Sequence, residues 1–297
     1  MDDDEGRRAL KRALELGVNF FDTAYVYGDD GHSEKVLGGV LRGCGKQVYA
    51  ATKVPAKTME WPARPSTPAE KAFPADWIVR CAEVSLKRLG LERIDLLQLH
   101  VWTDAWLGAE GWRKAARTLK EEGKIGAFGV SVNDNQPESV LKLAASGEID
   151  SIQVIYNIFE QVPAEKLFPV CREHDVAVIV RVPFDEGSLT GMLTPETRFP
   201  RGDWRAGYFK GERLADTCAR VEKLKESLRP GVSSLSDLAL KFVLSHPVVS
   251  TVIPGMRRVR NVEANCAVSD GKHLTPDELE RLKAHAWTRN FYAGAWD

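Results

Sequence analysis

Four residues whose side chains can take part in proton transfer recur at comparable places along the chain. Asp22, Lys53 and His100 each end a short run of apolar residues, and Tyr27 follows Asp22 by five residues. Neighbouring strands of a sheet lie about 5 Å apart. If the three runs are adjacent parallel strands, the four side chains converge on one small volume.

Such a group suits the reduction of a carbonyl. Hydride delivery to a carbonyl leaves a developing alkoxide that needs a proton, and a tyrosine with an ordinary pKa of about 10 is a poor donor at neutral pH. A neighbouring lysine cation favours the phenolate, and an aspartate compensates the buried ammonium and positions it. A histidine can hold the carbonyl oxygen in line. Taken singly, each residue type is more often structural, so the prediction rests on all four together.

The elements that would position these residues alternate along the chain. Short, nearly continuous apolar runs predict buried parallel strands, and amphipathic stretches between them predict helices. The expected strands are Val18–Thr23, Val48–Val54, Ile94–His100, Ile125–Ser131, Ser151–Asn157, Ala177–Val182 and Val248–Pro254. The expected helices are Asp4–Leu16, Ser33–Leu41, Asp76–Gly90, Trp112–Gly123, Pro137–Gly147, Glu165–Asp175, Gly211–Leu228, Ser233–Ser245 and Arg258–Ser269. Asp76 is the expected N-cap of its helix, and Gly90 is expected just after its end.

This alternation predicts an α/β fold with a mostly parallel sheet, either a doubly wound open sheet or a TIM (β/α)8 barrel. An open sheet that binds a dinucleotide would normally carry G-x-G-x-x-G after an early strand, and the sequence has none. The glycine-rich segment 38–47 lacks the spacing of a phosphate loop and is expected to be a helix end and a turn. The barrel is therefore favoured, with functional residues at the carboxyl ends of its strands.

One feature departs from a complete barrel. Only seven strands are expected, and the chain opens directly in the helix Asp4–Leu16, without a strand before it. The barrel is thus expected to be incomplete at its first strand, unless another segment closes the gap. The two longest irregular regions, Ala56–Ala75 and Pro183–Lys210, follow strands on the expected catalytic rim, where long loops carry function. No shift in composition divides the chain, so residues 1–297 are expected to form a single domain.

Composition narrows the class of partner and compartment. The 297 residues include 41 Lys and Arg against 42 Asp and Glu, a net charge of -1 that gives no reason to expect nucleic acid or an anionic membrane. No apolar run approaches the roughly 20 residues that span a bilayer, and the acidic start of the chain lacks the apolar segment of a secretory signal. Five scattered cysteines without a C-x-x-C pair suit reduced thiols in a cytoplasm and no metal site.

The motifs around these residues resemble one known family. Phe21-Asp22-Thr23-Ala24-x-x-Tyr27-Gly28, followed by Ser33-Glu34-x-x-Leu37-Gly38, resembles the signature of the aldo-keto reductases. Further matches in order and spacing are Ala51-Thr52-Lys53, Ile94-Asp95-Leu96-Leu97-x-Leu99-His100, Gly123-Lys124-Ile125-x-x-x-Gly129-Val130-Ser131, Gln153-Val154-x-Tyr156-Asn157 and Ile253-Pro254-Gly255. The resemblance runs from the first helix to nearly the end of the chain.

What the resemblance implies is a (β/α)8 barrel that binds NADPH in an extended pose and acts on small carbonyl compounds. It makes Asp22, Tyr27, Lys53 and His100 a catalytic tetrad with Tyr27 as general acid. Ser131 and Gln153 would bind the nicotinamide carboxamide. The remaining residues implied at the cofactor are Arg181, Phe184, Gly187, Ser188, Leu189, Gly255, Arg257, Arg258, Asn261 and Asn265.

Three of these assignments carry their own physical argument. Arg181 stands where family members often place an aromatic under the nicotinamide; a guanidinium can stack there but adds charge. The backbone of Gly187–Leu189 would donate to the pyrophosphate, although from the residues alone the segment reads as a plain loop. Arg257 and Arg258 precede a helix, which suits the 2′-phosphate of NADPH; a solvated surface pair is the other interpretation, and the sequence does not choose between the two arginines.

Aromatic residues gather on the expected rim loops and give candidates for a substrate pocket. They are Trp61, Trp102, Trp106, Trp204, Tyr208, Phe291, Tyr292 and Trp296, of which Trp102, two residues beyond His100, is the preferred choice. Packing anchors are the alternative for each. For the whole chain, the alternative to an enzyme is an NADPH-binding regulatory protein of the same fold that turns over poorly. A barrel isomerase would need a metal or phosphate site, for which the sequence has no motif.

Overall fold

A curled sheet of seven parallel strands organises the computed structural model, which describes residues 3–293. The strands are β1 (Phe20–Asp22), β2 (Tyr49–Val54), β3 (Ile94–Leu99), β4 (Ile125–Ser131), β5 (Ser151–Ile155), β6 (Ala177–Arg181) and β7 (Val249–Val252). They pair in chain order, each with the next. All seven fall within the runs predicted from the sequence, so the α/β fold class and its parallel sheet are confirmed.

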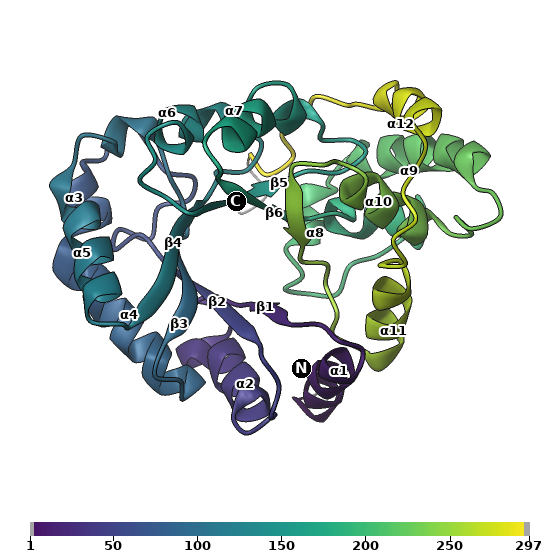
Figure 1. The fold of residues 1–297 in the computed structure, drawn as a ribbon. Helices are drawn as coiled ribbons and strands as arrows, with labels where there is room; N and C mark the ends of the chain where they lie inside the picture. Colours follow the sequence, from purple (N-terminus) through teal and green to yellow (C-terminus); the bar gives the residue numbers. More distant parts are fainter. Residues whose placement is uncertain (1–2, 294–297) are drawn as a thin grey trace.

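Helices lie outside the curled sheet, as Figure 1 shows. They are α1 (Asp3–Glu15), α2 (His32–Leu41), α3 (Ala69–Ala72), α4 (Ala75–Leu89), α5 (Glu110–Glu121), α6 (Leu141–Ala144), α7 (Leu167–Glu173), α8 (Arg205–Tyr208), α9 (Arg213–Leu224), α10 (Leu235–Leu244), α11 (Val259–Ala267) and α12 (Pro276–Lys283). Within residues 3–293, no helix has the length and apolar character needed to cross a membrane.

Two layers of apolar side chains hold the sheet and helices together. The larger layer lies between the strands and the helices; from α4, for example, it takes the stripe Ile78, Cys81, Ala82 and Leu89. The smaller layer is formed by strand residues alone. Its buried members are Ala51, Leu96 and Ile179. Because successive strand residues point to opposite faces, the residues two positions further along these strands point the same way. Those positions are Lys53, Gln98 and Arg181, so a polar layer follows the apolar one.

The ends of α4 and the position of α2 show how single residues set the packing. The helix begins after Pro74, so the predicted N-cap Asp76 lies in its first turn instead, and that prediction is wrong. It ends as predicted at Gly90, which has a left-handed φ of 64°. On α2, a Cβ at Gly38 would lie 2.1 Å from the carbonyl oxygen of Leu89. Glycine is therefore required where α2 packs against the end of α4.

The barrel has an open interval between β1 and β7. Within residues 3–293, the strand order begins at β1 and ends at β7, and the two do not pair. Helices α1 and α11 pack against each other beside this interval, near the N-terminus in Figure 1. The seven-stranded arrangement without a strand before α1 is the one predicted. Helix α12 has a capping box of Thr275 and Glu278 and was not predicted.

Candidate functional site

Asp22 and Lys53 form a buried ion pair at the carboxyl ends of β1 and β2. The Lys53 ammonium is fully buried and donates to the Asp22 carboxylate and, at 2.8 Å, to the carbonyl oxygen of Thr23. The other carboxylate oxygen of Asp22 accepts hydrogen bonds from Gln153 at 2.8 Å and from Gln98 at 3.4 Å. A buried charge is costly unless it is paired and hydrogen bonded. Four strands therefore cooperate to hold one ammonium group in place.

Tyr27 and His100 meet beside this ion pair. The Tyr27 ring centroid lies 5.2 Å from the Lys53 nitrogen and 5.6 Å from the His100 ring, which it faces edge-on. Tyr27 is 43% exposed and lies on the wall of a large cavity, whereas Lys53 lies beneath it. The loop after β1 is held by hydrogen bonds from the Thr23 amide to Ala51 and from the Tyr25 amide to Lys53. The four residues predicted to act together are thus adjacent.

His100 is uncharged at neutral pH in this environment. Burial lowers the pKa of His100 well below its usual value, and the positive charges of Lys53 and Arg181 lower it further. The backbone amide of His100 donates to the carbonyl oxygen of Val54 at 2.9 Å, which fixes the residue against β2. A neutral imidazole on a cavity wall can orient a polar oxygen by one hydrogen bond without adding charge.

The cavity in front of these residues has a volume of about 1550 Å³ and spans the open side of the barrel. Its lining includes Asp22, Tyr27 and His100 and extends along β7 to α1 and α11. Of the residues predicted to bind a cofactor, those on its lining are Ser131, Gln153, Arg181, Gly255, Arg257 and Asn265. The cavity is long enough to connect the end of β4 with α11, which an extended ligand requires.

Arg181 lies at the end of β6 and is neutralised locally. Its guanidinium donates to the Asp134 carboxylate at 2.6 Å and to the carbonyl oxygen of Val132 at 3.0 Å. Burial opposes the charge of this group, but Asp134 outweighs it, and the pKa of Arg181 is raised. The Nε atom of Arg181 is buried and has no hydrogen-bond partner. Arg181 thus lines the cavity, and its Nε is a donor without a partner just beneath the cavity surface.

The loop after β6 differs from its predicted role. It forms a short 3₁₀ segment, Asp185–Thr190, in which the amides of Gly187 and Leu189 already donate to the carbonyl oxygen of Phe184. The Ser188 hydroxyl donates to Asp185 at 2.7 Å, and Ser188 and Leu189 are buried. Phe184, Gly187, Ser188 and Leu189 are absent from the cavity lining. The structure does not bring these four predicted residues to the site.

The cofactor-binding residues predicted around the start of α11 fall into two groups in the structure. Arg257 is exposed and lines the cavity, whereas Arg258, the N-cap residue of α11, is exposed and is not part of the cavity lining. Asn265 lines the cavity, and its side-chain nitrogen is buried without a hydrogen-bond partner. Asn261 is exposed outside the lining. Of the two arginines that the sequence did not distinguish, the geometry favours Arg257.

The predicted substrate residue Trp102 is not at the site. It is fully buried and packs edge-on against Trp106 and Trp112, so it anchors the layer between the sheet and α5. The tryptophan that faces His100 is Trp61, whose ring centroid lies 5.0 Å from the His100 ring. Trp204 and Tyr292 also line the cavity, while Trp296 lies outside the described residues.

Three site residues were missed by sequence reasoning. Gln98 contacts Asp22, and the two-residue strand period from Leu96 to His100 would have pointed it inward. Asp134 follows β4 by three residues, and the rule of strand ends would have included it. Glu186 lines the cavity and accepts a hydrogen bond from Tyr292 at 2.5 Å. Burial raises the pKa of Glu186 to about 7. Its partner Tyr292 lies 106 residues further along the chain, so no local sequence pattern points to Glu186.

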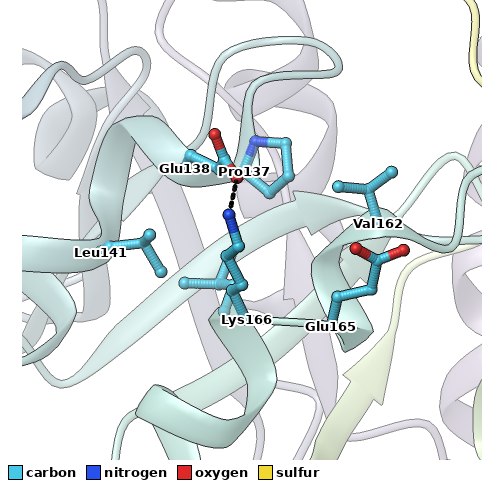
Figure 2. A pocket seen from close by; sticks show the side chains of 7 residues that line it. Pro137, Glu138, Leu141, Val162, Glu165 and Lys166 are labelled. Carbon is cyan, nitrogen blue, oxygen red and sulfur yellow. Dashed lines mark hydrogen bonds and ion pairs between the residues drawn. The ribbon is translucent and has the colours of Figure 1, made fainter.

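A second hollow lies elsewhere on the surface and has little room. Figure 2 shows it between Pro137, Leu141 and Val162, where Lys166 reaches over to Glu138. The ion pair measures 2.7 Å, and the hollow has a volume of about 10 Å³. That volume holds about one water molecule, so this hollow adds no second candidate site.

Comparison with known proteins gives one consistent family. The sequence model described as the Aldo/keto reductase family matches residues 1–286. The chain is 29% identical over 280 residues to the uncharacterized oxidoreductase YqkF of Bacillus subtilis, covering 93% of this chain and 86% of that protein. Among solved structures, it resembles aldo-keto reductase AKR11C1 from Bacillus halodurans (31% identity, TM-score 0.73, 96% of this chain and 88% of that one). It also resembles the glycerol dehydrogenase AKR11B4 from Gluconobacter oxydans (27% identity, TM-score 0.78, 96% and 86%).

Proposed function

Since the chain belongs to the aldo/keto reductase family of nicotinamide-dependent oxidoreductases, we propose that it transfers a hydride between NADPH and an aldehyde or ketone. The reverse reaction is the oxidation of the alcohol. The observation that carries this proposal is the meeting of Tyr27 and His100 on the cavity wall, directly above the buried Asp22–Lys53 pair.

Each member of this group has a distinct part in the proposal. Tyr27 donates the proton to the oxygen that becomes the hydroxyl group. Lys53 stabilises the negative charge that remains on the phenol oxygen, and Asp22 holds Lys53 in position. His100, uncharged because its pKa is lowered, orients the carbonyl oxygen toward Tyr27. The substrate is therefore expected to bind with its oxygen between the Tyr27 and His100 rings.

The residues on the cavity lining fit a nicotinamide cofactor. NADPH supplies the hydride when bound. Arg181 Nε and the Asn265 side-chain nitrogen are buried donors without partners, one near the tetrad and one on α11. Both side chains line the same cavity as Ser131, so an extended ligand with polar groups at both ends would meet hydrogen-bonding side chains along its length. Gln153 already donates to Asp22, so we propose that it contributes to the tetrad as well as to the carboxamide.

The preference for NADPH over NADH rests on Arg257. This exposed guanidinium lies on the cavity lining at the start of α11, where a phosphate group is stabilised by both the cation and the helix N-terminus. We also propose that residues 1–297 form one domain. All five cysteines are free thiols, which supports a reducing compartment such as the cytoplasm.

A second candidate function follows from the open interval between β1 and β7. Asp22 lies on β1, which is paired on one side only within the described residues. A protein of this kind that binds NADPH without efficient turnover would serve as a nucleotide-responsive partner. The intact contacts of Lys53 favour the enzyme.

Absorbance of the reduced nicotinamide, followed with a panel of aldehydes, separates these functions. The enzyme predicts turnover that Tyr27→Phe lowers by about 100-fold or more, while quenching of tryptophan fluorescence by NADPH persists in the variant. Quenching without turnover in the unmodified protein would support the binding function. Absence of both would refute the proposal.

A further inference from the structure

Asp134 connects the two sides of the cavity mouth. One of its carboxylate oxygens accepts the hydrogen bond from Arg181 at 2.6 Å, and the other accepts one from the indole nitrogen of Trp61, also at 2.6 Å. Arg181 belongs to β6, Trp61 to the loop between β2 and α3, and Asp134 to the loop after β4. Asp134 is only 6% exposed, so both bonds are largely shielded from water.

The loop that carries Trp61 is docked by its backbone as well. The Ala63 amide donates to the Asn133 side chain at 3.0 Å, and the Asn133 amide group donates back to the Ala63 carbonyl oxygen at 3.2 Å. This reciprocal pair fixes where the loop crosses the barrel. These backbone contacts do not fix the orientation of the Trp61 ring. The hydrogen bond from the Trp61 indole to Asp134 fixes that orientation. The ring then stands edge-on to His100, with an interplanar angle of 87°.

The mouth of the cavity beside this ring exposes apolar surface. Val26, Met59 and Trp61 are among the large apolar side chains that remain exposed, and all three line the cavity together with Tyr27 and His100. Apolar side chains gathered around a few polar groups are typical of a small-molecule site. Here the polar groups are those that would hold a carbonyl oxygen, and the apolar ones would hold the rest of the molecule.

We propose that Asp134 is a positioning residue that fixes Trp61 as the wall of the substrate site and thereby favours carbonyl compounds with an aromatic or branched apolar group. The inference rests on the proposed function, because it assigns the substrate side of the same site. Asp134 acts through Trp61: the ring packs on the apolar group while Tyr27 and His100 engage the oxygen.

Steady-state kinetics with benzaldehyde and propanal test this assignment. Trp61→Phe keeps a ring but removes the donor to Asp134, and Asp134→Asn removes the charge that both partners share. Each should lower kcat/KM for benzaldehyde by about tenfold, mainly through KM, because one hydrogen bond to a charged group is lost. Because Asp134→Asn also removes the partner of Arg181, the result is read as the ratio of kcat/KM for benzaldehyde to kcat/KM for propanal, and this ratio should fall by about tenfold in both variants. The double variant should be no worse for benzaldehyde than Asp134→Asn alone.

Thr67→Val is the matched control. Thr67 donates to Glu60 within the same loop at 2.6 Å and takes no part in the hydrogen bond between Trp61 and Asp134, so a loop that is merely loosened would respond to this change too. The benzaldehyde preference should survive it. Effects of Trp61→Phe and Asp134→Asn that multiply in the double variant, or an equal loss in Thr67→Val, would overturn the positioning role.

A spectroscopic readout separates this inference from the proposed function. In ¹⁵N-labelled protein, the indole resonance missing from Trp61→Phe identifies the Trp61 N–H. It should move in Asp134→Asn while the other indole resonances stay in place, whether or not any aldehyde is turned over. An unmoved Trp61 resonance would refute the bond to Asp134 even in an active enzyme. A moved resonance without turnover would leave Asp134 positioning Trp61 and count against the oxidoreductase function alone.

Discussion

Glu186 should make the stability of this protein fall as pH rises from about 4.5 to about 7. Burial raises the pKa of this carboxyl from 4.5 to about 7, against the opposing hydrogen bond from Tyr292. The folded state therefore holds the proton more tightly than the unfolded state does. Stability from this group is complete below the unfolded pKa and is lost as pH rises through the folded pKa. A difference of about 2.5 units at 1.36 kcal/mol each corresponds to about 3 kcal/mol.

Urea unfolding of the unmodified protein and of Glu186→Gln at pH 4.5, 6 and 8 measures this contribution. Glutamine stays neutral throughout, so other titrating groups cancel in the difference between the two proteins. The free energy of unfolding of Glu186→Gln should rise relative to that of the unmodified protein as pH increases, by up to about 3 kcal/mol at pH 8. Tyr292→Phe removes a donor to the carboxylate and should move the decline to higher pH. A difference between Glu186→Gln and the unmodified protein that is independent of pH would refute the reasoning.

Three further changes test other parts of the structure. Lys53→Met should cost about 3 kcal/mol of stability in urea unfolding, because Asp22 loses its cation, and should lower kcat by about 100-fold or more; stability equal to that of the unmodified protein would contradict the buried pair. Arg257→Ala should weaken NADPH by about tenfold and NADH by less than about twofold in fluorescence titrations, with Arg258→Ala as the control; equal weakening of both cofactors would argue against a 2′-phosphate contact. Gly38→Ala should lower the free energy of unfolding by about 1–3 kcal/mol, since the new methyl group meets the Leu89 carbonyl, whereas Gly39→Ala, which meets nothing within 4 Å, should be neutral or stabilising; similar effects of the two would contradict the packing of α2 on α4.

Local periodicity was sufficient to predict most of the fold. The strands are short apolar runs, and β2 to β6 are largely buried; a pattern of this kind is visible without knowing the neighbours. The clustering of the four proposed catalytic residues could be predicted for the same reason, since Asp22, Lys53 and His100 lie at the ends of such runs, although the contacts among them also required the strand order. Two other segments were harder to predict. Pro137–Val140, expected as the start of an α-helix, is a 3₁₀ helix. Helix α12 follows the last strand, where the alternation of strands and helices no longer indicates where a helix should lie.

Most of the predicted site residues that the structure places away from the cavity lie on loops. Trp102 and Trp61 are both rim tryptophans, and nothing in their neighbours along the chain distinguishes a packing anchor from a pocket wall. Their difference comes from long-range partners: Trp102 meets Trp112 on α5, whereas Trp61 meets Asp134, 73 residues away. The loop Gly187–Leu189 was expected to offer its amides outward, but positive φ values at Asp185 and Glu186 turn two of them back onto Phe184.

The open interval between β1 and β7 also affects the rate of local unfolding in each part of the sheet. In a closed ring of strands every ladder is supported from both directions, whereas here β1 is held by three residue pairs to β2 alone, within the described part of the chain. The strands near the middle, β3 and β4, are doubly paired. Amide hydrogen exchange should therefore be fastest in the two edge strands, β1 and β7, and slowest in the central strands. Asp22 lies on the edge strand β1. A ligand that contacts both β1 and β7 would therefore slow amide exchange in β1 and restrict the motion of the carboxylate that pairs with Lys53.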